Sequence, residues 1–434
     1  MHFNFRLKSV FLAALSAAAL VALPMAAAAQ GVTAIKAGKL FDSKSGTMQP
    51  NQVIIVSGER ITDVGPAASV KIPAGAKVID LSFATVLPGL IDGHVHLTDG
   101  LADAHMELQK AVEADLNSGF TTVVAMGAHS NRGKFVGPWT DTDAAKLIDA
   151  SKMTGSRIIS AGPIVGQEIP AKTPDEFRKG IDELHAHGAT HVKIVPNTTY
   201  SWDKAGKMSN TTVVTLDELK AAVDEAHKNG MWVATHSYGE GGLKFAIEAG
   251  VDDIQHAVAA DDTDIKNIVA KKLAVTSTIL DLRQDEFKDL PVFAPYSLFR
   301  TMHDTWLKMY KAGVILGFGS GATPVTNGGG RIFNETCNCS HGVQAEHLVV
   351  LNHWGVPPAY ILKMATSVNA AIIKRDKDLG SIEKGKLADI IAVDNDPLQD
   401  ITEMQTVRFV MQGGRVFKNT LVAKAPAANQ TAER

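Results

Sequence analysis

Four histidines in this chain stand at the ends of short apolar segments. His94 and His96 occur in "PGLIDGHVHLTDG". His236 ends "MWVATH", and His256 ends "VDDIQH". Residues two apart on a strand point to the same face, so the first two imidazoles can share one direction. Neutral imidazole is a common ligand of zinc and related metals. A single histidine is more often a core or surface residue, and it is the shared position at strand ends that predicts a metal site.

A lysine occupies the corresponding place in "HVKIVP", where Lys193 lies near the end of an apolar segment. An ammonium group among metal-ligating histidines would repel the cation. The residue pattern leaves two interpretations open. Lys193 extends to the rim of the fold with its charge in water, or its amine is neutral and has captured carbon dioxide as a carbamate that bridges two metals.

A repeated helix and strand unit positions these residues. In "TLDELKAAVDEAHKNGMWVATH", Thr215 and Glu218 have capping-box spacing, and Gly230 closes the helix before a buried strand. In "TPDEFRKGIDELHAHGATHVKIVP", Thr173 is the expected cap and Pro174 the first helical residue. Eight strands are expected, one before His94 and the others near 120–126, 156–161, 191–195, 231–236, 251–256, 273–279 and 314–319.

Eight strands alternating with helices predict an α/β fold, a (β/α)8 TIM-type barrel over residues 88–379. An open doubly wound sheet is the alternative, but it requires a phosphate-binding glycine turn after the first strand, and the sequence has none there. Alternating segments in 30–87 and 380–418 predict a small β domain formed by both ends of the chain. Residues 419–434 have the composition of a disordered tail.

The chain has 434 residues, of which 45% are hydrophobic and 21% charged, and its formal net charge is -3. This composition suits a large globular core and gives no reason to expect a nucleic acid partner. Residues 1–29 resemble a secretory signal peptide rather than a membrane anchor, because the apolar run is short and no basic stop follows it. We therefore expect a secreted or periplasmic protein without a membrane contact after signal removal.

The chain has only two cysteines, Cys337 and Cys339. They cannot form a disulfide framework for so large a fold, and a bridge across one residue would be strained. We interpret them as loop thiols or a minor local bridge.

Several motifs together resemble the amidohydrolase superfamily, and most closely its imidazolonepropionase-like branch, which includes metal-dependent dipeptidases, carboxypeptidases and ochratoxin-hydrolysing amidohydrolases. The motifs are "VLPGLIDGHVHL", "HVKIVP", "VATHSYGEGGLKFAIEAGVDDIQHAV" and "ATSVNAAIIKRDKDLGSIEKGKLADIIAVDNDPL". The resemblance covers nearly all of the chain after residue 29.

The resemblance implies a binuclear centre of two divalent metal ions, most commonly zinc. His94 and His96 would hold the more buried metal and His236 and His256 the more exposed one, while Lys193, as its carbamate, would bridge both. A hydroxide activated by the metals would attack the carbonyl of an amide bond.

The family also has an aspartate at the end of strand eight, which acts as general base and passes a proton to the leaving amine. In "VILGFGSGATP" the aligned residue is Gly321. No carboxylate occurs between Ala312 and Asn334. We interpret the chain as a slowed or inactivated enzyme, with a base located elsewhere as the alternative.

Three further residues are candidates for substrate contacts. His129 could bind the substrate carbonyl, and Tyr238 and Arg331 could bind a free carboxylate. Each of the three could equally be a residue of the rim or surface. The expected substrate is a dipeptide or N-acyl amino acid, with ochratoxin-type amides included.

Two other functions stay open. One is a lactonase or phosphotriesterase with the same centre, and the other is a non-catalytic binding protein that has lost its base. A deaminase fits less well, because a bridging lysine favours two metals. The resemblance also implies a homo-oligomer.

Overall fold

The computed structural model describes residues 31–98, 104–127, 137–202, 208–278, 298–323, 330–332, 335–337 and 340–422. The predicted signal peptide (1–29), His129 and Cys339 lie outside these residues. For Arg331 and Cys337 the backbone alone is described. Across the described part of the chain, no helix combines the length and the apolar composition needed to cross a membrane.

Eight parallel strands carry the residues singled out above. Seven of them begin and end within two residues of a predicted strand, and β5, predicted only as a strand before His94, includes that residue. They are β5 (Leu90–Val95), β6 (Phe120–Ala125), β7 (Arg157–Ser160), β8 (His191–Ile194), β11 (Trp232–Ser237), β12 (Asp253–His256), β13 (Ala274–Thr278) and β14 (Ile315–Gly319). The first three strands form one sheet, and the other five form a second sheet in the order β14-β13-β12-β11-β8.

Hydrogen bonds join these two sheets on both sides. After β14, the Gly321 N–H donates to the carbonyl of His94 at 2.8 Å. Asn369 braces the same junction through its side-chain amide, which bonds carbonyls of β5 and β14 at 2.8 and 2.7 Å. Between β7 and β8, the Thr190 N–H donates to the carbonyl of Ser160 at 2.9 Å. The strands therefore follow one another in chain order, as a (β/α)8 barrel requires.

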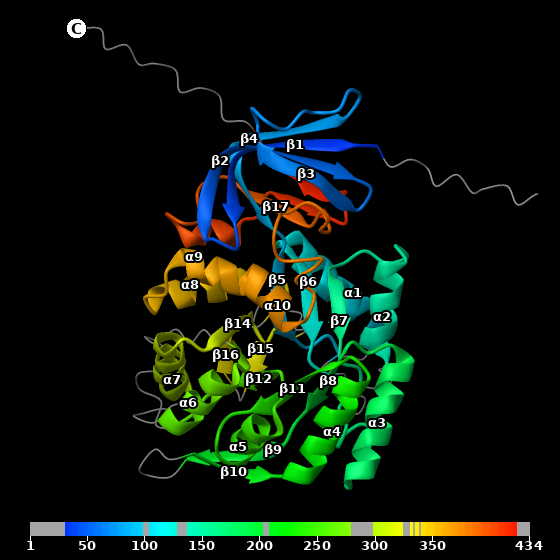
Figure 1. Ribbon diagram of the computed structural model, residues 1–434, viewed down its shortest axis with the longest axis vertical. Coiled ribbons are helices and arrows are strands. Elements are labelled where there is room, and N and C mark those ends of the chain that lie inside the picture. Colours follow the sequence, from blue (N-terminus) through cyan, green and yellow to red (C-terminus); the bar gives the residue numbers. More distant parts are fainter. Residues whose placement is uncertain are drawn as a thin grey trace, which may run out of the picture. The chain divides into compact units, whose positions relative to one another are not determined.

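Helices follow most of these strands and cover their outer faces (Figure 1). The described helices are α1 (Ala104–Asn117), α2 (Thr140–Asp149), α3 (Pro174–His187), α4 (Leu216–Lys228), α5 (Glu240–Ala249), α6 (Asp262–Lys271), α7 (Leu298–Ala312), α8 (Ala345–His353), α9 (Pro358–Lys363) and α10 (Asn369–Ile372), with a π-helical turn at Met364–Val368 before α10. The capping box of Thr215 and Glu218 is present, and Thr173 caps α3. Both predicted caps are confirmed.

Two hairpins are inserted into this pattern. They are β9 (Asn197–Trp202) with β10 (Met208–Thr212), and β15 (Gly330–Ile332) with β16 (Glu335–Cys337). The first follows β8 and the second follows β14. Both therefore extend the chain after the carboxyl ends of barrel strands.

Strands from both ends of the chain form one further sheet, which confirms the predicted β domain. Its order is β19-β18-β17-β4-β1-β2-β3, and Figure 1 shows the blue and red strands side by side. The strands are β1 (Thr33–Asp42), β2 (Thr47–Ser57), β3 (Arg60–Pro66), β4 (Lys77–Pro88), β17 (Ile390–Val393), β18 (Phe409–Gln412) and β19 (Arg415–Asn419). The expected tail begins at Asn419, the last residue of β19, and residues from 423 lie outside the described part.

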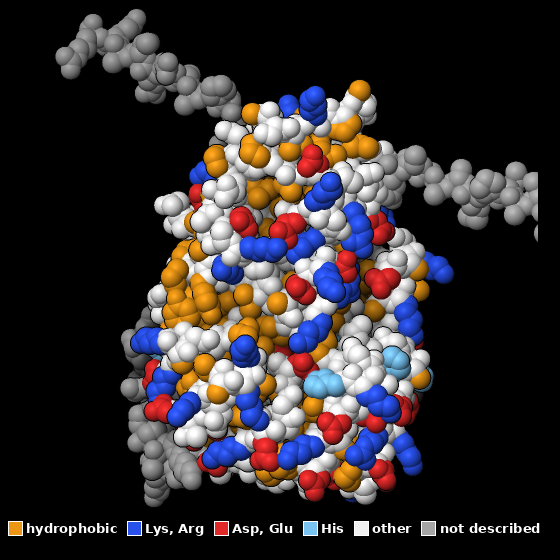
Figure 2. Space-filling model, viewed as in Figure 1, with side chains coloured by type: hydrophobic (Ala, Val, Ile, Leu, Met, Phe, Trp, Pro, Cys, Tyr) orange, Lys and Arg blue, Asp and Glu red, His pale blue; other side chains and the backbone are white. Residues whose placement is uncertain are grey.

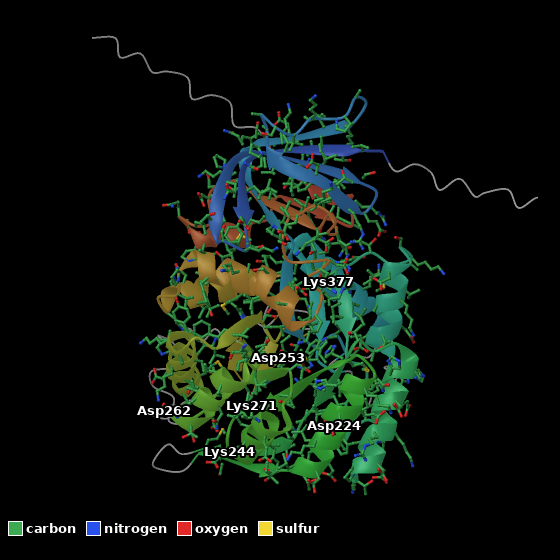
Figure 3. All side chains as sticks on the ribbon, viewed as in Figure 1. Asp224, Lys244, Asp253, Asp262, Lys271 and Lys377 are labelled. Carbon is green, nitrogen blue, oxygen red and sulfur yellow. The ribbon has the colours of Figure 1, made fainter. Side chains whose placement is uncertain are left out.

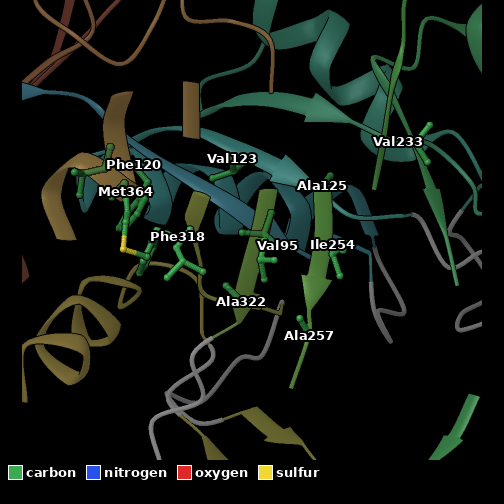
Figure 4. Close-up of a cluster of buried hydrophobic side chains, with 14 of the residues drawn as sticks. Val95, Phe120, Val123, Ala125, Val233, Ile254, Ala257, Phe318, Ala322 and Met364 are labelled. Atoms are coloured by element: carbon green, nitrogen blue, oxygen red, sulfur yellow. The ribbon is translucent and has the colours of Figure 1, made fainter. Parts of the chain in front are cut away.

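The barrel core is apolar on the helix side of the strands. Figure 4 shows Val95, Phe120 and Phe318 in this cluster, and the rings of Phe120 and Phe318 stack at 5.8 Å between centroids. A buried ion pair connects the core to the β domain, because Arg157 of β7 donates to the carboxylate of Asp389 at 2.5 Å. Removing such a partner leaves a charge without compensation in a medium of low polarity.

We expect Asp389→Asn to lower the free energy of unfolding by about 3 kcal/mol, because the guanidinium of Arg157 stays buried without its carboxylate. Denaturant titration of both proteins measures the difference. Glu248→Gln is the control, since the pair of Lys220 and Glu248 is exposed and its loss should cost less than about 1 kcal/mol. Equal losses in the two variants would contradict this role of Asp389.

On the surface of the protein, basic and acidic side chains are interspersed, as Figure 2 shows.

Candidate metal centre

The five predicted metal ligands come from the carboxyl ends of four strands. β5 carries His94, with His96 just beyond it, while β8 carries Lys193, β11 carries His236 and β12 ends at His256. His256 has a φ of 79°, a conformation that residues other than glycine rarely adopt. Such strain is retained where the surrounding contacts determine the conformation. The structure therefore brings all five residues to one end of the barrel.

The four imidazoles form two close pairs. Nε2 of His94 lies 3.1 Å from Nε2 of His96, and Nε2 of His256 lies 2.9 Å from Nδ1 of His236. The rings of His94 and His256 are 5.0 Å apart and connect the pairs. Separations near 3 Å suit two nitrogens that bind one tetrahedral ion, since each metal to nitrogen bond is about 2 Å.

In each pair, one ring has its Nδ1, the nitrogen that faces away from the partner ring, in contact with a polar side chain. Nδ1 of His94 lies 2.6 Å from Oε1 of Gln255, and Nδ1 of His256 lies 2.8 Å from Oγ1 of Thr278. Ring partners of this kind fix the orientation of a ligating histidine. Both rings therefore present Nε2 to their neighbours.

Burial keeps these rings neutral. It lowers the pKa of His94, His236 and His256 well below the usual value, and the nearby positive charge of Lys193 acts in the same direction on all three. An imidazole must be deprotonated at one nitrogen before it can bind a metal. The barrel mouth therefore supplies histidines in their ligating form.

Lys193 is buried among these rings with 2% of its surface exposed. Within the described residues its Nζ has no hydrogen-bond partner. Burial lowers the pKa of this amine to about 7, against the attraction of the Asp253 carboxylate. The arrangement disfavours the rim interpretation of Lys193, because the amine lies inside the barrel rather than in water.

These residues fit a metal centre with one reservation about their donor count. In the described parts of the chain, no group of three or more His, Cys, Asp or Glu side chains is arranged to hold a metal ion. Each histidine pair supplies two nitrogens, and zinc sites in proteins typically use three or four protein ligands. The unpartnered amine of Lys193 is the group that could complete both pairs, provided that it becomes an anionic ligand.

Gly321 lies beside the first histidine pair, as its backbone bond to His94 shows. Its φ of 69° is in the left-handed region. A Cβ at this position would meet only the side chain of Thr278, at 3.2 Å, and Thr278 contacts His256. A side chain at position 321 would therefore extend next to the histidines, and glycine places no functional group there.

A family model, described as the amidohydrolase family, matches residues 85–417. The chain belongs to the amidohydrolase family. The predicted resemblance is therefore confirmed, and members of this family typically use divalent metal ions.

Three relatives illustrate the similarity. Ochratoxinase from Aspergillus niger is 23% identical over 444 residues, which cover 89% of this chain and 87% of the relative. The crystal structure of a Xaa-Pro dipeptidase with bound methionine in the active site is 26% identical, with a TM-score of 0.75 and coverage of 90% and 100%. The structure of molinate hydrolase is 23% identical, with a TM-score of 0.77 and coverage of 93% and 100%. These similarities confirm the TIM-type barrel with its β domain, and family membership supports an amide hydrolase.

Among the expected substrate contacts of this amidohydrolase, only Tyr238 has a described side chain. Its ring stacks on His236 at 4.8 Å and meets His256 edge-on at 4.9 Å. Burial raises the pKa of Tyr238 to about 12. The phenol therefore stays protonated and can donate a hydrogen bond beside the second histidine pair. His129 lies outside the described residues, and for Arg331 only the backbone is described.

Sequence reasoning missed several buried residues around the histidines. Asp92, two positions before His94, accepts hydrogen bonds from the hydroxyl of Ser320 at 2.5 Å and its N–H at 3.0 Å. Asp253 and Gln255 are buried on β12. Strand alternation could have suggested Asp92, because it shares a face with His94 on β5. It does not suggest Asp253 and Gln255, because they alternate with the ligand of their own strand, His256. Their pairing across strands is a property of the fold.

A buried ion pair also supports the first histidine pair from outside. His341 lies 2.8 Å from the carboxylate of Asp115, and its Nε2 donates to the carbonyl of His96 at 3.1 Å. Burial is the largest single influence and by itself would lower the pKa of His341, but the charge and hydrogen bond of Asp115, the His96 carbonyl and the charge of Asp92 together raise it. The imidazole of His341 therefore connects α1 to the chain beyond β5.

We expect this pair to make stability depend on pH. The pKa of His341 is higher in the folded state than in the unfolded state. The stabilisation that His341 contributes to the folded state is therefore complete at pH values below the unfolded-state pKa of about 6.5, and it is lost as the pH rises through the folded-state pKa. In Asp115→Asn this decline with rising pH should disappear, as measured by urea unfolding at several pH values. His303→Gln, at a histidine beside the exposed Asp304, should leave the decline unchanged. An unchanged profile in Asp115→Asn would contradict the assignment.

Proposed function

We propose that this amidohydrolase is a binuclear metal-dependent enzyme that cleaves peptide or N-acyl amino acid bonds, and that this copy is impaired at Gly321. The observation that carries the proposal is the pairing of four imidazoles, three of which burial keeps neutral, around the buried amine of Lys193. His94 and His96 would hold one ion, and His236 and His256 the other. Zinc suits this set of nitrogen donors best.

Lys193 would act as the bridging ligand after carboxylation. A neutral amine can attack carbon dioxide and lose a proton, and the resulting carbamate would supply an anionic ligand to both histidine pairs. Bound divalent ions would supply Lewis-acid polarisation of the substrate carbonyl and a nucleophilic hydroxide near neutral pH. The burial of Lys193 supports the required neutral amine.

The substrate class is proposed from the relatives and the nearby residues. Relatives bear the names ochratoxinase and Xaa-Pro dipeptidase, so an amide next to a free carboxylate is a reasonable substrate. Tyr238 can donate a hydrogen bond to such a group. We retain His129 for the substrate carbonyl and Arg331 for the carboxylate as proposals. We also propose a secreted or periplasmic homo-oligomer.

A non-catalytic binding protein is the second candidate, and Gly321 is the observation that favours it. The family's general base would extend from this position, and glycine offers no proton acceptor there. Loss of general acid and base catalysis typically lowers rates by about 10²- to 10⁴-fold. Binding of the substrate can survive such a loss, since the ligands and Tyr238 are unaffected.

We expect Gly321→Asp to raise the rate of amide hydrolysis by about 10²-fold or more, because it supplies a carboxylate next to the histidines. The assay measures turnover of N-acyl amino acids and dipeptides. Gly321→Asn is the matched control, since asparagine tolerates the left-handed backbone about as well as aspartate but cannot accept the proton. A folded, metal-loaded Gly321→Asp that is no faster than Gly321→Asn would contradict the role of this position and favour the binding protein.

We expect Lys193→Met to lower the bound metal from two ions per chain to one or none, because the bridging ligand is lost. Metal analysis after dialysis against a weak chelator measures the stoichiometry. Lys386→Met is the control, since Lys386 is also buried but bonds Ser381 and a backbone carbonyl of the β-domain segment. If Lys193→Met retained two ions, the bridging role would be wrong.

A further inference from the structure

A short chain of hydrogen bonds runs behind the first histidine pair. Nδ1 of His94 lies 2.6 Å from Oε1 of Gln255, and Nε2 of Gln255 lies 2.5 Å from Oδ2 of Asp253. The hydroxyl of Thr276 donates to the same carboxylate at 2.9 Å. His94, Gln255, Asp253 and Thr276 are all buried. The chain crosses from β5 to β12 and β13 inside the barrel, where Figure 3 labels Asp253.

The direction of the Gln255 amide follows from its partner at the far end. The carboxylate of Asp253 is surrounded by donors, namely the amide of Gln255 and both the hydroxyl and the backbone N–H of Thr276. An ionised carboxylate only accepts hydrogen bonds, so the NH₂ group of Gln255 faces Asp253 when Asp253 is ionised. Its carbonyl oxygen then faces His94 and can only accept. Nδ1 of His94 must therefore carry the hydrogen.

We propose that Gln255, oriented by Asp253, is a positioning residue that selects the tautomer of His94. With the hydrogen on Nδ1, the lone pair lies on Nε2, the nitrogen that faces His96. A reversed amide would present NH₂ to Nδ1 and move the hydrogen to Nε2, which would then be unable to bind a metal. The hydrogen's position is independent of the proposed function, whereas its consequence for metal binding rests on it.

Packing alone gives no reason for these polar residues. Ile254 lies between Asp253 and Gln255 on β12 and points to the apolar core, as Figure 4 shows. The opposite face of the same strand carries two polar groups in the barrel interior. Buried polar groups are often no more stabilising than apolar residues of similar volume. Their specific orientation is therefore a better account of their presence than stability.

The test compares four full-length proteins with ¹⁵N-labelled histidine. Gln255→Leu removes the acceptor. Gln255→Glu restores an acceptor at Nδ1, since a protonated glutamate can donate to Asp253 and still accept from His94. Gln412→Leu is the matched control, because Gln412 is also a buried glutamine with a side-chain bond, to the carbonyl of Thr121 at 2.7 Å, in the β domain.

The first measurement is the ¹⁵N spectrum of the His94 ring in chelator-treated protein, which distinguishes the two tautomers without any metal. We expect the Nδ1–H form in wild type, Gln255→Glu and Gln412→Leu, and its loss in Gln255→Leu. The second measurement is the affinity for zinc by chelator competition. We expect about 10- to 100-fold weaker binding of one ion in Gln255→Leu, with the other ion unaffected.

The outcomes separate the two hypotheses. An unchanged tautomer in a folded Gln255→Leu would overturn the positioning role. A changed tautomer with no zinc bound by any of the proteins would support the positioning role and overturn the proposed metal centre. Should Gln255→Leu not fold, Asp253→Asn replaces it, because an asparagine can meet the Gln255 amide with either end. That variant should show a mixture of both tautomers, and a pure Nδ1–H form would overturn the proposal.

Discussion

The barrel mouth depends on gathering five nitrogen-bearing side chains in a buried space where positive charge is disfavoured. Two imidazole pairs lie at 3.1 and 2.9 Å between nitrogens, and positive charges on neighbouring groups at such distances would repel one another. Burial opposes protonation, since it lowers the pKa of His94, His236 and His256 and that of the Lys193 amine. Neutral nitrogen donors gathered in this way are predisposed to bind cations.

The backbone contact that joins β14 to β5 also positions the first ligand. A Cβ at Gly319 would lie 2.8 Å from the Cβ of His94, so only glycine permits the approach. The N–H of Gly321 then bonds the His94 carbonyl, and the hydroxyl of Ser320 bonds Asp92 on the same strand. Junction and site are therefore one structure. Any side chain added at position 321 enters this junction and can disturb it. The effect of a carboxylate there is therefore seen only by comparing Gly321→Asp with Gly321→Asn, which disturb the junction to a similar extent.

Buried polar residues form a second layer around the ligands. Gln255 and Thr278 bond the outer nitrogens of His94 and His256. Both contacts join different strands: β5 to β12 across the barrel interior for His94, and β12 to the neighbouring β13 for His256. Orientation in this form costs little stability if every polar group is satisfied. It also makes ligand geometry sensitive to the register of the strands.

Much of the architecture was predictable from local patterns. Capping residues such as Thr215 and Thr173 bond groups within the first turn of their helix. Each of the eight strands is recognised from the apolar residues of one short segment. Both signals are therefore contained in short windows of sequence. The same holds for the site, because His94 and His256 stand at strand ends that local patterns already place.

What the sequence by itself determined is thus the order of the elements, their type and the residues at their ends. Only the tertiary structure decided which of those residues meet. His94 and Gln255 are 161 positions apart in the sequence, and no local pattern signals their contact, because it depends on closure of the barrel and on strand register. The burial that lowers the pKa of Lys193 is likewise a collective property of the strands around it, and no short window of sequence contains it.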